Sequence, residues 1–89
     1  MRIEFDPTKE AANLAKHGVS LALALELDWD AALVWVDDRF EYDELRMIAL
    51  APKTSILYYV AFVERGEVRR PIRLRRANRR EVKRYVQSL

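Results

Sequence analysis

The run from Ile56 to Val63 is almost continuously apolar, and this feature most constrains the fold. A strand of that composition is typical of the centre of a sheet, where other parts of the chain cover both faces. The turn-forming segment Arg65 to Glu67 leads from it into Val68 to Arg75, which predicts a β-hairpin. Because the chain has 89 residues, too few for two cores, we expect a single domain over residues 1–89.

The N-terminal third predicts a short strand and two helices. Arg2 to Phe5 has a strand composition, and the segment from Asp6 to Gly18 begins with a capping residue and a proline and ends in a glycine, as helices do. Ser20 can cap a second helix from Leu21 to about Asp28. Leucines in that stretch also alternate as in a strand, but its Ala and Leu content without β-branched residues favours the helix.

Two further strands and a last helix complete the pattern. Ala32 to Asp37 and Arg46 to Leu50 have strand composition, and a turn containing Pro52 follows the second. In the helix expected from about Asn78 to Ser88, the apolar residues recur at helical spacing and should dock on the sheet. The sequence therefore predicts an α+β domain with two N-terminal helices, an antiparallel sheet of about four strands, and a C-terminal helix packed on the sheet.

The alternation of side chains along the last strand predicts which face of the sheet its arginines occupy. It places Arg69, Arg73 and Arg75 on one face and the apolar residues Val68, Ile72 and Leu74 on the other. Pro71 has no N–H to donate to a ladder, so we expect an edge position or a bulge there.

Charge is divided unevenly along the chain. Residues 1–64 contain six Lys and Arg against twelve Asp and Glu, whereas residues 65–89 contain ten against two, and the net charge is +2. A concentrated cationic segment attracts phosphate polymers, so RNA is an expected partner. The alternative is a solvated basic surface that balances an acidic body.

Composition excludes several kinds of chemistry. The chain has no cysteine and one histidine, which leaves no thiolate nucleophile, disulfide or clustered zinc ligands, so we expect no metal and no cofactor. The longest nearly uncharged run, Val19 to Leu25, is far shorter than the roughly 20 residues that cross a bilayer. We therefore expect no membrane association and a cytoplasmic location.

Several short motifs stand in a characteristic order: Phe5-Asp6-Pro7 with Asn13 and Lys16 to Val19; Asp38-Arg39 with Glu44 and Arg46; and Arg75-Arg76-Ala77 with Glu81 and Tyr85. Over essentially the whole chain they resemble the BrnT family of type II toxins. The resemblance implies a ribonuclease with a RelE-like fold that inhibits translation and growth. It also implies a cognate BrnA-type antitoxin with a ribbon-helix-helix part, and contact with operator DNA only through that antitoxin.

Two positions depart from the family pattern. Asp43 stands where a glycine usually precedes the glutamate of the middle motif. Arg73 stands where a small residue, often serine, precedes the C-terminal motif, and it adds a cation beside the expected site.

Metal-independent RNA cleavage needs a proton acceptor, cations for the phosphorane-like transition state and an acid for the leaving oxygen. Arginine binds phosphate through a planar fork of donors, so Arg46, Arg75 and Arg76 form the expected clamp, with salt-bridge partners of the acidic body as the alternative. Further backbone contacts are expected from cations of the last strand and helix: Arg73, Arg79, Arg80 and Lys83.

The remaining candidates have structural alternatives. His17 titrates near neutral pH and is the candidate proton carrier, but it could equally be a helix-terminal cap. Glu44 could accept a proton or hold Arg46 in position, and the second role is favoured because a carboxylate beside arginines is normally ionised and paired. Tyr85 could donate to the leaving oxygen or stack on a base, or could belong to the core.

Two other function classes remain open. One is a non-catalytic nucleic-acid-binding module that lies along a backbone, and the other is an interaction domain whose cationic face receives an acidic partner such as the antitoxin. Exposed strand edges and the Leu21 to Leu27 stripe are compatible with a homodimer or a hetero-oligomer.

Overall fold

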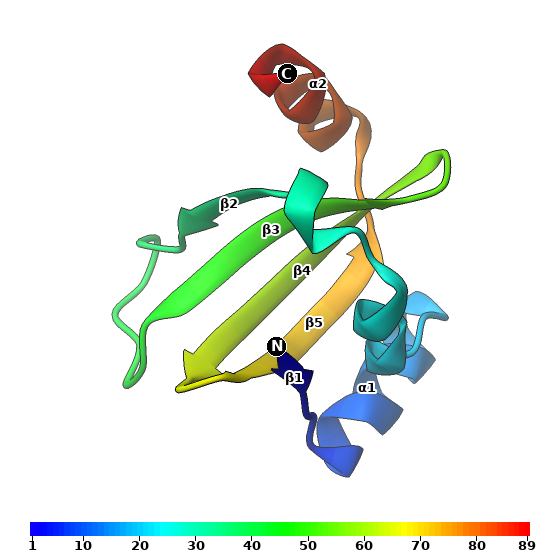
Figure 1. The fold of residues 1–89 in the computed structure, drawn as a ribbon. Helices are drawn as coiled ribbons and strands as arrows, with labels where there is room; N and C mark the ends of the chain where they lie inside the picture. The colour runs from blue at the N-terminus through cyan, green and yellow to red at the C-terminus, as the bar shows by residue number, and fades with distance from the viewer.

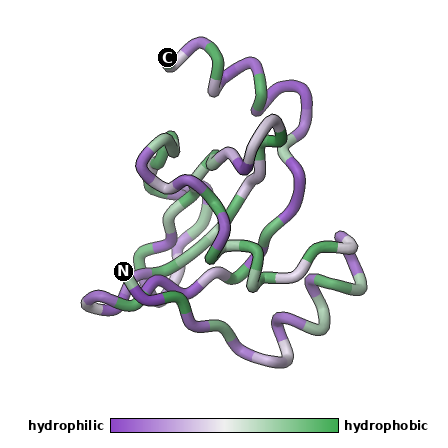
Figure 2. The backbone as a smooth tube through the Cα atoms, turned by 45° about the vertical axis from the view of Figure 1, so that its right-hand side comes forward, coloured by the Kyte–Doolittle hydropathy of each residue, from purple (hydrophilic) through white to green (hydrophobic).

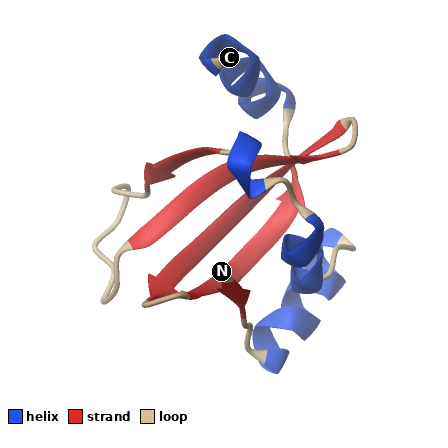
Figure 3. Cartoon of the chain, in the orientation of Figure 1, coloured by secondary structure: helices blue, strands red, loops and turns tan.

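The computed structural model describes residues 1–89. Its elements follow in the order β1 (Arg2–Ile3), α1 (Pro7–His17), two 3₁₀ helices η1 (Leu21–Glu26) and η2 (Trp29–Ala31), β2 (Leu33–Val36), β3 (Arg46–Lys53), β4 (Ile56–Arg65), β5 (Val68–Arg76) and α2 (Arg79–Ser88). The strands form one five-stranded sheet in the order β1-β5-β4-β3-β2, antiparallel except for the β1 and β5 pair (Figures 1 and 3). This arrangement confirms the α+β class, and the predicted N-terminal strand supplies the fifth strand.

Helix α1 begins and ends where its capping residues predict. The Asp6 carboxylate accepts hydrogen bonds from the backbone N–H groups of Thr8 and Lys9. Gly18 adopts the left-handed conformation with φ 69°, and its N–H donates to the Leu14 carbonyl at 2.8 Å. The helix predicted from this pattern is confirmed, and His17 is its last residue.

Asn13 fastens α1 to the free edge of β5. Its Oδ1 accepts from the Leu74 N–H at 3.0 Å, and its Nδ2 donates to the carbonyls of Leu74 at 2.8 Å and Val19 at 2.9 Å. Asn13 is buried, so it takes the place of a neighbouring strand at a point that β1 is too short to reach. The last turn of α1, with His17, is thereby held beside the C-terminal half of β5.

The segment after Ser20 is helical, but with the three-residue period of a 3₁₀ helix. Side chains three apart eclipse one another in such a helix, so Leu21, Ala24 and Leu27 share the buried side while Leu25 is 67% exposed. The segment is neither the strand that the alternating leucines would allow nor the α-helix that its composition favoured. The predicted second helix is therefore present in a tighter form.

The two faces of the sheet carry different clusters. On one face η1 contributes Leu21 and Ala24 to a core of eight buried residues that also includes Phe62, Val60 and Leu74. On the other, which we call the open face, a smaller cluster of Ile48, Leu50, Tyr59 and Ala61 lies beneath Trp35, Ala77 and Tyr85. Successive apolar residues of β4 therefore point to opposite faces of the sheet, as in a central strand that is covered on both faces.

Strand β3 runs further than the sequence predicts. The expected turn at Pro52 is wrong, because Pro52 pairs with Leu57 within the β3 and β4 ladder and the reversal falls at Thr54, which has φ 53°. Pro52 lies one residue from the strand end, and its carbonyl accepts from the Asp28 N–H at 2.8 Å. A proline is therefore tolerated here as the ladder finishes.

A β-bulge in β5 rearranges its arginines. Arg73 pairs with Ala61 but Pro71 already pairs with Phe62, so Ile72 is an extra residue. Alternation shifts by one at that point, so Arg69 lies on the face opposite Arg73 and Arg75, with its guanidinium 4.8 Å from the centre of the Phe62 ring. The bulge expected at Pro71 is confirmed, and the grouping of Arg69 with the other two is wrong.

Helix α2 stands on the open face and touches it sparingly. Asn78 and Glu81 form the predicted capping box, and the Tyr85 hydroxyl donates to the Ala31 carbonyl at 2.6 Å. The remaining apolar residues of its stripe are exposed by 41% at Val82, 58% at Val86 and 85% at Leu89, so the expected docking of the whole stripe is wrong. Figure 2 shows polar and apolar residues alternating along this projecting helix.

Candidate functional site

Strands β3 and β5 bring four arginines to the open face on either side of Tyr59. Register pairs place Arg46 beside Val63, Arg73 beside Ala61, and Arg75 beside Tyr59, and the bulge adds Arg70 to the same face. Arg76 follows Arg75 in an extended strand, so its side chain leaves on the opposite face. Arg46, Arg75 and Arg76 were predicted to form one clamp, but the structure places only Arg46 and Arg75 on the open face, and of these two only Arg46 lines the cavity described below.

Arg75 is held rigidly by two neighbours. Its Nη1 and Nη2 donate to the two carboxylate oxygens of Glu81 at 2.8 and 2.9 Å, and its guanidinium lies 4.0 Å from the centre of the Tyr59 ring. Glu81 raises the pKa of Arg75. Partial burial acts to raise the pKa of Glu81, but hydrogen bonds from Arg75 and from the Asn78 N–H lower it overall. The pair is therefore fully ionised at neutral pH.

A buried carboxylate orders the loop that follows β2. The Asp37 side chain is 2% exposed and accepts from Arg39 Nε at 2.8 Å, Arg39 Nη2 at 3.0 Å and the Tyr42 hydroxyl at 3.1 Å. The Arg39 hydrogen bonds hold the pKa of Asp37 at about 2, and the carboxylate in turn raises the pKa of Arg39. Arg39 also donates to the Tyr59 hydroxyl at 3.4 Å.

These side chains surround a cavity of about 310 Å³, the central hollow, which is lined by Arg39, Tyr42, Arg46, Tyr59 and Arg73 among others. The Arg46 guanidinium lies 4.0 Å from the centre of the Tyr42 ring. No carboxylate forms an ion pair with Arg46 or Arg73. The central hollow therefore offers two arginines without a carboxylate partner, Arg46 and Arg73, beside Arg39, which Asp37 holds in place. Arg75 does not line this hollow but lies against the ring of Tyr59, which does.

His17 lies next to this hollow but in a smaller cavity of about 170 Å³ that it shares with Lys9, Lys16 and Arg73. Burial lowers the pKa of His17, and the charges of Lys16, Arg73 and Arg75 lower it further. Its Nε2 is buried without a hydrogen-bond partner. The imidazole is therefore neutral at pH 7, and Arg73 lines both cavities.

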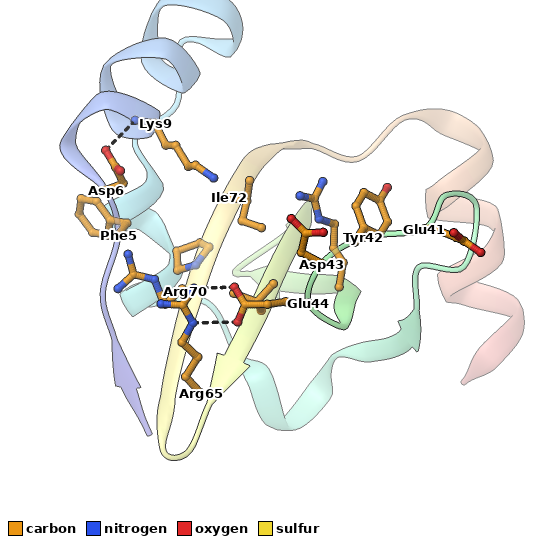
Figure 4. A pocket seen from close by; sticks show the side chains of 13 residues that line it. Phe5, Asp6, Lys9, Glu41, Tyr42, Asp43, Glu44, Arg65, Arg70 and Ile72 are labelled. Carbon is orange, nitrogen blue, oxygen red and sulfur yellow. Dashed lines mark hydrogen bonds and ion pairs between the residues drawn. The ribbon is translucent and has the colours of Figure 1, made fainter.

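Glu44 does not hold Arg46, contrary to expectation. It accepts from Arg65, with Nε to Oε2 at 2.8 Å, on the wall of a cavity of about 510 Å³ that adjoins the central hollow and shares Tyr42, Arg46 and Ile72 with it (Figure 4). The hydrogen bond from Arg65 lowers the pKa of Glu44. Arg46 pairs with Val63 in the β3 and β4 ladder, Glu44 lies two residues before Arg46, and Arg65 lies two residues after Val63. Arg65 is therefore the nearer cation for Glu44.

The remaining predicted residues lie on α2. The Tyr85 hydroxyl donates a hydrogen bond to the Ala31 carbonyl, and the side chain packs against the smaller cluster, so Tyr85 anchors the helix. Arg79, Arg80 and Lys83 are exposed on the same helix, and Arg80 reaches the cavity beneath it.

Four residues of the central hollow were not predicted as site residues: Asp37, Arg39, Tyr42 and Tyr59. Asp37 had a signal in the sequence, because an acidic residue that ends an apolar strand with an arginine two positions later is suited to a local ion pair. Tyr59 had a weaker one, a hydroxyl within the most apolar strand, where an unpaired polar group is costly.

The side chains do not group into a metal site, because no cluster of three or more His, Cys, Asp or Glu residues occurs. Neither α1 nor α2 has the length and hydrophobicity that a bilayer crossing demands.

Comparison with known proteins gives one result that bears on this surface. The family model described as ribonuclease toxin, BrnT, of type II toxin-antitoxin system matches residues 5–81. Those residues include α1, the whole sheet after β1 and the first turn of α2, and hence every side chain of the central hollow. Among the curated proteins, none matches the chain.

Proposed function

The chain belongs to the BrnT family of ribonuclease toxins of type II toxin-antitoxin systems, and from that premise we propose that it cleaves RNA in the central hollow without a metal ion. The observation that carries the proposal is that Arg46 and Arg73, which have no carboxylate partner, line one cavity with Arg39, which Asp37 holds in place. Fixed cations stabilise a developing negative charge without reorganising, which is the largest contribution in many enzymes.

In the proposed reaction Arg46 and Arg73 bind the non-bridging oxygens of the scissile phosphate. Neither has a carboxylate partner to give up, so phosphate binding breaks no ion pair. Arg75 keeps its carboxylate partner Glu81 and contributes charge from a fixed position. This positive charge stabilises the phosphorane-like transition state more than the bound substrate, because negative charge builds up on the phosphate oxygens during the reaction.

The proton transfers are assigned to His17 and Tyr59. The 2′-oxygen attacks phosphorus and its proton passes to Nδ1 of the neutral His17 imidazole, since Nε2 is buried, while the bond from phosphorus to the 5′-oxygen breaks. Tyr59 replaces Tyr85 as the acid for that oxygen, because its hydroxyl accepts from Arg39 and its own proton is not donated within the protein. Water later returns both proton-transfer groups to their starting states.

The cations of α2 extend the phosphate-binding surface beyond the hollow. Arg79, Arg80 and Lys83 project from an exposed helix whose first turn adjoins the site. The contribution of Arg79 and Lys83 is sequence-independent and falls as salt concentration rises.

Membership of a type II toxin family implies a cognate antitoxin and an RNA substrate. We propose a BrnA-type ribbon-helix-helix antitoxin that covers the arginines of the open face and brings the complex to operator DNA. In the absence of that partner, RNA cleavage in the cytoplasm would inhibit translation and growth.

The test is cleavage of a generic RNA by purified protein in EDTA. We expect product from the wild type and a loss of about tenfold or more from Arg46→Ala and Arg73→Ala, since a charge-assisted phosphate contact contributes on the order of 1.5–3 kcal/mol. Arg2→Ala, an exposed arginine of β1, is the matched control. Salt-dependent RNA binding without any product would favour a non-catalytic binding module, and cleavage only after addition of a divalent cation would contradict metal independence.

A further inference from the structure

A second cavity of about 270 Å³, the helix hollow, lies between α2 and the open face. The sheet contributes Trp35, Ile48 and Tyr59 to its walls, and α2 with its cap contributes Asn78, Arg80 and Arg84. The helix hollow and the central hollow share Arg39 and Tyr59. A ligand that places a phosphate in the central hollow therefore has the helix hollow immediately beside it.

The sheet side of the helix hollow presents an aromatic ring to that ligand. Trp35 is half-buried on the smaller cluster, and the Arg84 guanidinium lies 3.8 Å from the centre of its ring. Arg84 belongs to an exposed helix position and has no carboxylate partner. A planar ring can thus stack on Trp35 in place of the guanidinium, or on the guanidinium itself, as nucleobases do on tryptophan and arginine.

The polar side of the helix hollow offers mainly donors, because its carboxylate and amide oxygens already accept hydrogen bonds and its groups without a partner are donors. Both Glu81 oxygens accept from Arg75, and Oε1 also accepts from the Asn78 N–H. The Asn78 side-chain oxygen accepts from the Glu81 N–H. This leaves the Asn78 amide nitrogen and the guanidinium groups of Arg80 and Arg84, which only donate.

We propose that the helix hollow is a nucleobase subsite for RNA and that it prefers guanine. Guanine presents two adjacent acceptors, O6 and N7, on one edge, whereas adenine and cytosine present an amino donor on theirs. Trp35 supplies the stacking surface, and Asn78 and Arg80 supply the donors. The position of this base next to the cleaved phosphate rests on the proposed function, but base binding itself does not.

Binding is measured by fluorescence in a Trp29→Phe background, which leaves Trp35 as the sole tryptophan. Trp29 lies on the opposite face of the sheet, in the larger cluster. We expect GMP to quench Trp35 with an affinity about tenfold higher than AMP, CMP or UMP, the discrimination typical of a good two-bond base contact. Equal affinity for the four mononucleotides, or no quenching by any of them, would overturn the guanine subsite.

Two variants probe the donors separately from the fold. Asn78→Ser keeps a residue that caps helices but removes the amide donor, and Arg80→Ala removes a guanidinium from an exposed position. Each should weaken GMP binding about tenfold and leave UMP binding nearly unchanged, whereas Arg2→Ala should change neither. Equal weakening for all four mononucleotides would show a general phosphate contact and overturn the base assignment.

Cleavage of RNA with a single guanine in a uridine background then locates the subsite. We expect one dominant cut next to the guanine, which Asn78→Ser disperses. Guanine binding by a protein that cleaves no RNA would support the subsite and count against the proposed function. Cleavage at every position with equal efficiency would overturn the subsite and leave the proposed function intact.

Discussion

Replacing Asp37 with Asn tests whether a buried carboxylate orders the loop beside the central hollow. The pKa of Asp37 falls from 3.8 to about 2. Each pKa unit corresponds to about 1.4 kcal/mol, so the full shift represents about 2.4 kcal/mol. Because the Arg39 side chain is 60% exposed, water screens the pair, and we expect a loss of about 1 kcal/mol at pH 7.

The pH dependence gives the sharper test. A carboxylate with a lowered pKa in the folded state contributes its stability above the unfolded pKa and loses it as pH falls through the folded value. The difference between wild type and Asp37→Asn should therefore be constant from pH 7 to about 5 and shrink between about pH 4 and 2.

The assay is urea unfolding followed by tryptophan fluorescence at pH 7, 4 and 3, with Asp38→Asn as the control at an exposed neighbouring position. In thermal unfolding at pH 7 the same loss should lower Tm by about 4–8 °C for a domain of this size. Equal stability of Asp37→Asn and wild type at pH 7, or a difference that does not change with pH, would refute the assignment of the pKa shift to Arg39.

Three other predictions follow from single contacts. Asn13→Ala should cost about 3 kcal/mol in urea unfolding, because it leaves a buried N–H and carbonyl of Leu74 without partners; a loss below about 0.5 kcal/mol would contradict this. Glu44→Gln should change RNA cleavage by less than about twofold, because its partner is the exposed Arg65, and a large loss of cleavage would return Glu44 to the site. In the wild type, kcat/KM should fall with decreasing pH only below about 6.5, because burial and nearby cations keep the His17 base neutral above that value; His17→Ala should remove this limb, and a fall that begins well above pH 7 would assign the limb to another group.

The elements that local residue chemistry determines were predictable. The Asp6 and Gly18 caps place α1, and the Asn78 cap places α2, because each cap satisfies backbone groups within a few residues of itself. The apolar run of β4 predicted its central position, because a strand that is buried on both faces needs apolar residues at nearly every position. The period of η1 was not predictable, since its choice of a 3₁₀ turn depends on the sheet surface it covers.

Which residues form the site depends on how segments that are distant in the sequence pair in the sheet, and this pairing could not be predicted from the sequence alone. The bulge at Ile72 decides that Arg70 joins Arg73 and Arg75 while Arg69 leaves them. The geometry of the loop after β2 decides that Glu44 reaches Arg65. Arg76 could have been excluded earlier, because two consecutive residues of a strand cannot share a face.

The neighbouring arginines Arg75 and Arg76 allow the most direct test of the claim that the open face cleaves RNA. They have the same side chain and adjacent positions in β5, but only Arg75 faces Tyr59 and Glu81. Cleavage of RNA in EDTA should fall by about tenfold or more in Arg75→Ala and remain near the wild-type rate in Arg76→Ala, with Tm measured for both. Equal losses in the two variants, or a loss in Arg76→Ala alone, would contradict the assignment of the reaction to this face.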